Sequence, residues 1–118
     1  MRINTLLLIM LSLVGMSCAA ANERDNTKIN VGITLQPYYS YVSAVVGDRA
    51  NIIPLVDPGF NPHNYLPQPK DMQRLEQMDV IVVNGIGHDD FAMKVISAAQ
   101  RDDLIVIKAN KDVPYSLR

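Results

Sequence analysis

The chain has 118 residues, a formal net charge of −1 at pH 7 and a single cysteine. This length fits one small domain with a modest core. The near-neutral charge without a basic run argues against nucleic-acid binding, and a lone cysteine excludes an intramolecular disulfide.

The first 21 residues are predicted to be a secretory signal peptide. Arg2 supplies the positive charge, and residues 6–14 (LLLIMLSLV) form an apolar run that is too short to remain as a membrane-spanning helix. The polar stretch that follows, residues 22–27 (NERDNT), is predicted to be a short leader. The mature protein is therefore expected in the periplasm or on the extracytoplasmic face of the cell membrane.

Two processing routes fit the residues after this apolar run. Cleavage after the small residues Ala19, Ala20 and Ala21 would release a soluble protein. Alternatively Cys18 could carry the lipid anchor of a bacterial lipoprotein, although Gly15 stands where such sites usually have leucine. Both routes stay open from the residues alone.

The remainder of the chain alternates between strand and helix patterns. Apolar or alternating runs predict strands at residues 28–34, 51–56, 80–83 and 104–107, and helical periodicity predicts helices at residues 37–46, 69–78 and 89–99. This β-α-β-α-β-α-β order is typical of a right-handed α/β layer. We expect four parallel strands in the order 2-1-3-4 with helices on both faces.

Helical spacing and end signals support two of these helices. Tyr38, Tyr41, Val42 and Val45 recur at i, i+3, i+4 and i+7, which predicts one packed face, and Gly47 supplies a stop. In the last helix Asp89 is the predicted N-cap.

Five of the seven prolines fall between Pro54 and Pro69, and His63 lies among them. Proline fixes φ near −65° and restricts the preceding residue, so this stretch is predicted to be stiff before any ligand binds. A stiff segment loses little entropy when it presents an imidazole to a ligand. His63 is therefore a candidate metal ligand.

Ligands in parallel α/β sheets gather at the carboxyl ends of the strands. The proline-rich stretch and residues 84–88 (NGIGH) both lie at that edge of the predicted sheet. His63 and His88 could therefore reach one crevice, which makes His88 a second candidate metal ligand. A capping or hydrogen-bonding role for His88 is the competing interpretation.

The sequence lacks the residues that an enzyme, a dinucleotide-binding domain or a phospho-acceptor domain would need. The Gly85-x-Gly87 pair has no third glycine at the spacing of a dinucleotide fingerprint. A phospho-acceptor domain would need acids where this chain has Thr34 and Asn84. No nucleophile stands at a strand end with a base in reach, so a binding protein is predicted rather than an enzyme.

The run PHNYLPQPKD, followed by LEQMDVIVVNGIGHDDF, resembles the substrate-binding proteins of zinc and manganese ABC importers. That resemblance implies that His63 is the first metal ligand and that Tyr65 supports the loop. It also implies that residues 28–118 are part of the N-terminal lobe of a two-lobed metal-binding protein. Asn61 and Gln68 depart from the family pattern, which usually has aspartate and serine or threonine there. We expect Asn61 to weaken a hydrogen bond to the histidine, and Gln68 to weaken the start of the helix at residue 69 rather than the site.

The resemblance implies capture of a divalent transition metal, zinc first and manganese next, for delivery to the membrane permease of an ABC importer. The family's further ligands lie beyond the last residue of this chain. An extracytoplasmic adhesion or structural domain, and a truncated non-functional remnant of the transport protein, are the alternatives.

Overall fold

The structure is a computed structural model that describes residues 27–114. The predicted signal peptide, Cys18 and nearly all of the polar leader lie outside the described residues. Within residues 27–114, none of the helices has the length and apolar character that a membrane span requires.

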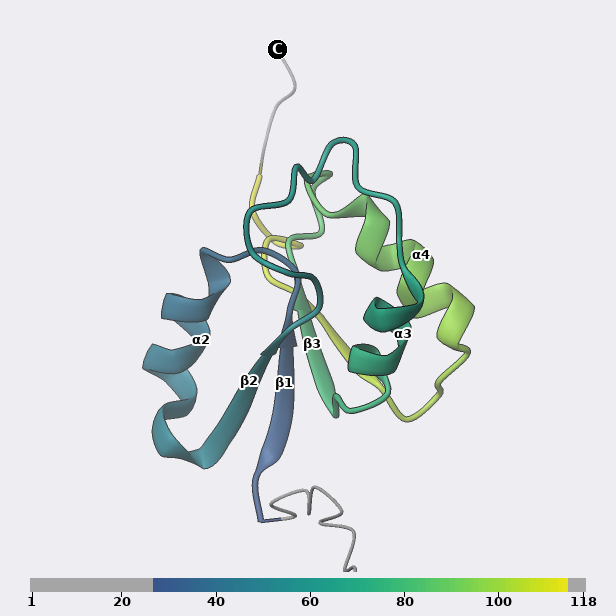
Figure 1. The fold of residues 1–118 in the computed structure, drawn as a ribbon. Coiled ribbons are helices and arrows are strands. Elements are labelled where there is room, and N and C mark those ends of the chain that lie inside the picture. Colours follow the sequence, from purple (N-terminus) through teal and green to yellow (C-terminus); the bar gives the residue numbers. More distant parts are fainter. Residues whose placement is uncertain (1–26, 115–118) are drawn as a thin grey trace, which may run out of the picture.

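Four parallel strands form one sheet in the order β2-β1-β3-β4 (Figure 1). They are β1 (Ile29–Ile33), β2 (Ala50–Pro54), β3 (Val80–Val83) and β4 (Ile105–Lys108). Val31 in β1 lies opposite Ile52 of β2 on one side and Val80 of β3 on the other. The predicted parallel α/β layer and its strand order are therefore confirmed.

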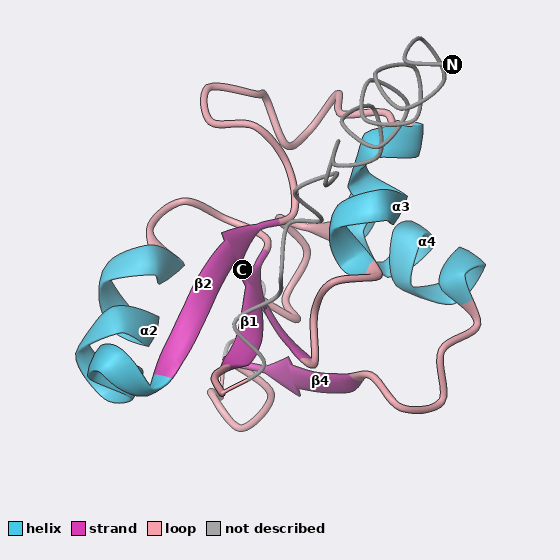
Figure 2. Ribbon diagram, turned by 60° about the horizontal axis from the view of Figure 1, so that its bottom comes forward, coloured by secondary structure: helices cyan, strands magenta, loops and turns pink. Residues whose placement is uncertain are grey.

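Helices cover both faces of this sheet (Figure 2). The helix α2 (Tyr38–Val46), followed by the short 3₁₀ turn η1 (Gly47–Arg49), lies on one face. The helices α3 (Pro69–Leu75) and α4 (Asp90–Ala99) lie together on the other. The arrangement follows from right-handed crossovers, because the chain moves first from β1 to β2 and then back across the sheet to β3 and β4.

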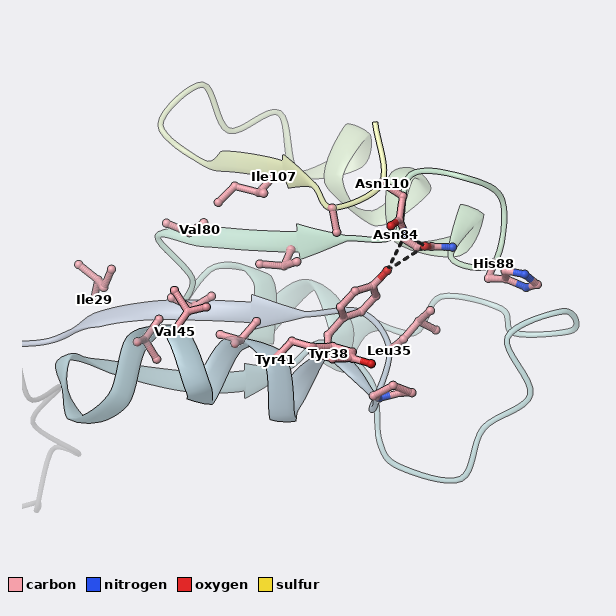
Figure 3. A pocket seen from close by; sticks show the side chains of 16 residues that line it. Ile29, Leu35, Tyr38, Tyr41, Val45, Val80, Asn84, His88, Ile107 and Asn110 are labelled. Carbon is pink, nitrogen blue, oxygen red and sulfur yellow. Dashed lines mark hydrogen bonds between the residues drawn. The ribbon is translucent and has the colours of Figure 1, made fainter. Parts of the chain in front are cut away.

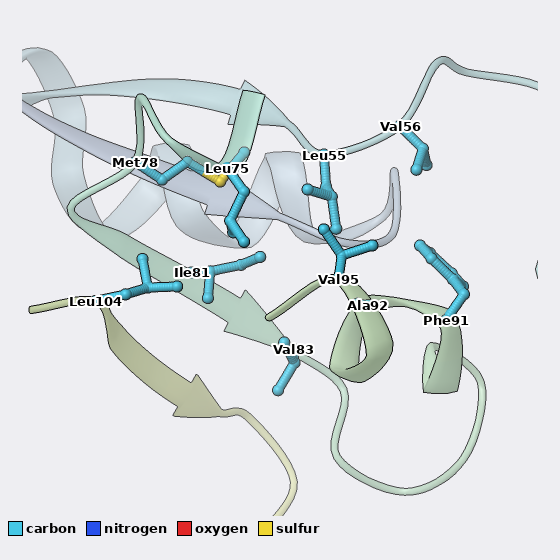
Figure 4. Packing of buried hydrophobic residues seen from close by; sticks show 10 residues of the cluster. All are labelled: Leu55, Val56, Leu75, Met78, Ile81, Val83, Phe91, Ala92, Val95 and Leu104. Carbon is cyan, nitrogen blue, oxygen red and sulfur yellow. The ribbon is translucent and has the colours of Figure 1, made fainter. Parts of the chain in front are cut away.

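The larger hydrophobic core lies between the sheet and the pair α3 and α4 (Figure 4). Its side chains come from both helices, from β3, from the chain after β2 and from the segments just before β3 and β4: Leu55, Val56, Leu75, Met78, Ile81, Val83, Phe91, Ala92, Val95 and Leu104. Ile81 and Val83 alternate with half-buried neighbours along β3, so the strand delivers its more buried side chains to this face.

The core on the α2 face is smaller, and here one prediction was wrong. Val42 packs against Val31 and Ile33, but Tyr41 and Val45 are 68% and 77% exposed. These two side chains line an open groove with Val80 of β3 instead of a packed interface. The helical spacing was correct, but on this side of α2 no second helix of the described residues packs against it.

The predicted helix 69–78 ends early, at Leu75. Arg101 explains the end, because its Nη1 donates hydrogen bonds to the carbonyl oxygens of Leu75 at 2.9 Å and Met78 at 2.8 Å. A cation that satisfies the last carbonyl groups stabilises a helix C-terminus. Met78 is still buried, because the turn that follows the helix folds back onto the core.

Candidate metal site

The proline loop (residues 55–68) connects β2 to α3 and passes the carboxyl edge of the sheet (Figure 1). Its first part is attached to α3 by Asp57, whose carboxylate accepts hydrogen bonds from Lys70 and Arg74. These two cations hold the pKa of Asp57 below its usual range. The loop is thus anchored at its base by charge as well as stiffened by proline.

The turn that carries His63 is fixed by Asn61. The Oδ1 atom of Asn61 accepts a hydrogen bond from the backbone N–H of His63 at 3.0 Å, and its carbonyl oxygen accepts one from Asn64 at 3.2 Å. A short polar side chain that bonds the backbone two residues on is a standard turn former. Asn61, which stands where the family usually has aspartate, therefore still provides a side-chain oxygen that accepts the His63 N–H and forms the turn.

Tyr65 holds the other side of this turn. Its ring packs edge-to-face against Phe60 and Phe91, with both centroids at 5.0 Å. Its hydroxyl donates a hydrogen bond to Oδ2 of Asp71 at 2.7 Å. Burial, with the Asp71 carboxylate, raises the pKa of Tyr65 to about 12, so the hydroxyl keeps its proton at neutral pH. The predicted supporting role of Tyr65 in the loop agrees with these contacts.

Asp71 also organises the start of α3. Its Oδ2 accepts the backbone N–H of Gln68 at 2.8 Å, and its own N–H donates to the carbonyl oxygen of Gln68 at 2.9 Å. Sequence reasoning expected Gln68 to weaken this helix start. The Asp71 carboxylate makes the reciprocal bond of a capping box, to the backbone N–H of Gln68, and so compensates for part of that loss.

The glycine turn (residues 84–89) carries His88 between β3 and α4. Gly85 and Gly87 have φ values of 82° and 110°, which favour glycine. Asp89 occupies the predicted N-cap position, but its side chain makes no capping hydrogen bond. Its Oδ2 accepts hydrogen bonds from the Thr34 hydroxyl at 2.6 Å and the Asn84 backbone N–H at 2.5 Å. The buried carboxylate therefore joins the ends of β1 and β3.

A second polar network lies next to this turn and was not predicted. Asn84 Oδ1 accepts hydrogen bonds from the Tyr38 hydroxyl at 2.8 Å and from Nδ2 of Asn110 at 2.5 Å (Figure 3). Burial raises the pKa of Tyr38. These residues form the polar end of an apolar groove of about 760 Å³ between α2 and the strands β3 and β4, and His88 lies at the same end.

His63 and His88 come together at the carboxyl edge. Their ring centroids are 5.7 Å apart with an interplanar angle of 72°, and both side chains are exposed. Beside them a cleft of about 440 Å³ lies between the proline loop and the start of α2, with Phe60, Pro62 and His88 in its wall. The two rings approach each other as expected, but His88 lines this cleft and His63 is not among its lining residues.

The separation of the rings suits a shared ion. Two imidazoles bound to one zinc ion at 2.0–2.1 Å with tetrahedral angles place their centroids roughly 5 Å apart. The observed 5.7 Å is close to that separation. Within residues 27–114 no group of three histidine, cysteine or acidic side chains could hold a metal. The pair is thus at most half of a four-ligand site.

Residues 31–117 match the ZnuA family, described as the periplasmic component A of a zinc-uptake complex. This match covers most of the chain. The chain belongs to the ZnuA family.

Individual ZnuA-like proteins agree with that assignment. A structure of the substrate-binding protein FpvC of Pseudomonas aeruginosa in complex with Ni²⁺ is 49% identical, with a TM-score of 0.71 over 76% of this chain and 33% of FpvC. The metal ABC transporter substrate-binding lipoprotein ScbA of Streptococcus cristatus is 30% identical over 91% of this chain and 35% of ScbA. The zinc-binding lipoprotein AdcA of Streptococcus pneumoniae is 27% identical over 95% of this chain and 22% of AdcA.

The chain spans well under half the length of each of these ZnuA-like relatives. The likeness to FpvC extends to the fold, since the same four-stranded α/β layer superposes.

Proposed function

We propose that this chain is the metal-capturing part of an extracytoplasmic substrate-binding protein, which delivers a divalent transition metal to the membrane permease of an ABC importer. The observation that carries the proposal is the approach of His63 and His88 to 5.7 Å between ring centroids. Imidazole nitrogen is a preferred ligand of such ions, and both rings are exposed to an incoming metal. The chain's role is binding rather than catalysis.

Zinc is the first candidate for the cargo and manganese the second. A pair of imidazoles favours nitrogen-preferring ions, whereas manganese prefers more oxygen donors. FpvC has structures in complex with Ni²⁺ and with Mn²⁺, so this one relative binds both ions. The remaining ligands would come from outside residues 27–114, since residues 28–118 are proposed as part of one lobe of a two-lobed protein.

The proposed location is the periplasm or the outer face of the cytoplasmic membrane. ScbA and AdcA are named as lipoproteins. Anchoring through Cys18 and release after Ala21 both remain compatible with the sequence.

Calorimetric titration of the chain with zinc tests the proposal. A complete structural zinc site contributes roughly 10–16 kcal/mol, and two of its four ligands, without the chelation that the other two add, would supply about 4–7 kcal/mol. That corresponds to a dissociation constant between about 1 mM and about 10 µM. Binding of one zinc per chain in this range, tighter than manganese, is expected; no heat of binding at millimolar zinc would contradict it.

The variant His88→Ala is expected to raise the dissociation constant for zinc about tenfold. The loss is moderate because Gly85 and Gly87 leave the His88 turn more conformational freedom to lose on binding. Asn64→Ala is the matched control, since Asn64 is an exposed neighbour of His63 and should leave zinc affinity unchanged. If His88→Ala and the unmodified chain bound zinc with equal affinity, His88 would not be a metal ligand.

A further inference from the structure

Asp71 is an unusual carboxylate for the start of a helix because it is fully buried. Burying a carboxylate is unfavourable unless hydrogen bonds compensate for its lost hydration. Its Oδ2 accepts two such bonds, from Gln68 and from Tyr65, whereas its Oδ1 has no partner among the described residues. Capping α3 explains the Gln68 bond but requires neither the burial nor the bond to Tyr65.

The bond from Tyr65 connects α3 to the loop that presents His63. Tyr65 lies two residues after His63, and its ring packs against Phe91 of α4, with centroids 5.0 Å apart. The hydroxyl at the far end of the ring reaches Asp71 at 2.7 Å. The loop is thus attached to both helices on this face through one side chain.

His63 is consequently held from both sides. Before it, Asn61 accepts its backbone N–H, and after it, Tyr65 fixes the direction in which the chain leaves the turn. His88 stands on a separate element, a turn whose first residue donates its backbone N–H, that of Asn84, to the Asp89 carboxylate. The distance between the two imidazoles therefore depends on where Tyr65 places the loop relative to α4.

We propose that Tyr65 and Asp71 are positioning residues for metal capture: their hydrogen bond keeps the His63 ring at a distance from His88 that one ion can bridge. This inference rests on the proposed function for its metal readout. Its structural part, the distance between the histidines in the metal-free chain, can be measured independently. Neither residue contacts the metal.

The test is Tyr65→Phe, which keeps the ring between Phe60 and Phe91 and removes only the donated hydrogen bond. Zinc affinity is expected to fall five- to tenfold. Nuclear Overhauser contacts between the His63 and His88 rings, measured without metal, are expected to weaken. Tyr41→Phe is the matched control, because Tyr41 is exposed on α2 and undergoes the same chemical change. It should alter neither quantity.

Asp71→Asn provides a second variant that retains an acceptor for Tyr65 but removes the charge. An affinity between those of the unmodified chain and Tyr65→Phe is expected. Unchanged ring contacts in Tyr65→Phe would overturn the proposal, even if zinc affinity fell, because the loop would then hold its place without the bond. Weakened ring contacts in a chain that binds no zinc would support the positioning role and contradict the proposed function.

Discussion

Replacing His63 by alanine is expected to weaken zinc binding by about a hundredfold, to a millimolar dissociation constant or weaker. One of four ligands in a zinc site is worth about 2.5–4 kcal/mol, and each 1.4 kcal/mol is a factor of ten. His63 should contribute about 2.7 kcal/mol, more than His88, because its loop is stiffened by prolines and held by Asn61 and Tyr65. Isothermal titration with zinc, compared with His88→Ala, measures the difference.

The same Asn64→Ala chain serves as the control for a surface substitution in this loop. His63→Ala should leave the free energy of unfolding nearly unchanged, since the His63 side chain is exposed. Zinc affinity that survives the substitution would place the binding site elsewhere and reduce the proline loop to a connection.

Phe91→Ala is expected to lower the free energy of unfolding by about 3–5 kcal/mol. Phe91 is 4% exposed, and its ring supports both Phe60 and Tyr65, with centroids at 5.2 Å and 5.0 Å. Its removal creates a cavity under the proline loop and reduces the apolar surface that is buried on folding. For a small domain this is a large share of a total of about 5–15 kcal/mol.

Urea denaturation followed by circular dichroism measures this loss. Met93→Ala is the matched control, because Met93 lies on the same helix, is 36% exposed and should cost far less. Equal losses for the two variants would show that the aromatic cluster does not support the loop.

The sheet could be predicted from the sequence because its signals are local. Continuous apolar runs such as residues 80–83, separated by helical periodicity, imply parallel strands covered on both faces. Right-handed crossovers then limit the strand order to few possibilities. The placement of His63 near His88 followed from the same rule, because both segments come after strands.

Features that depend on distant partners could not be predicted. Asp89 was predicted to be an N-cap, but its carboxylate instead accepts a hydrogen bond from Thr34, which lies 55 positions earlier in the chain. The hydrogen bond between Tyr38 and Asn110 spans 72 positions. The end of α3 depends on Arg101, which follows a later helix. The helical periodicity of α2 could not reveal how much of the sheet face beneath this helix would be covered by other elements.

X-ray absorption spectroscopy of the zinc-loaded chain at millimolar concentration tests the central claim most directly. The account predicts two imidazole nitrogens at about 2.0–2.1 Å from the zinc, with the shell completed by oxygen donors such as water. One imidazole should remain in His63→Ala and one in His88→Ala. A shell without imidazole, or the same two imidazoles in all three chains, would contradict the assignment of this pair as the metal-capturing site.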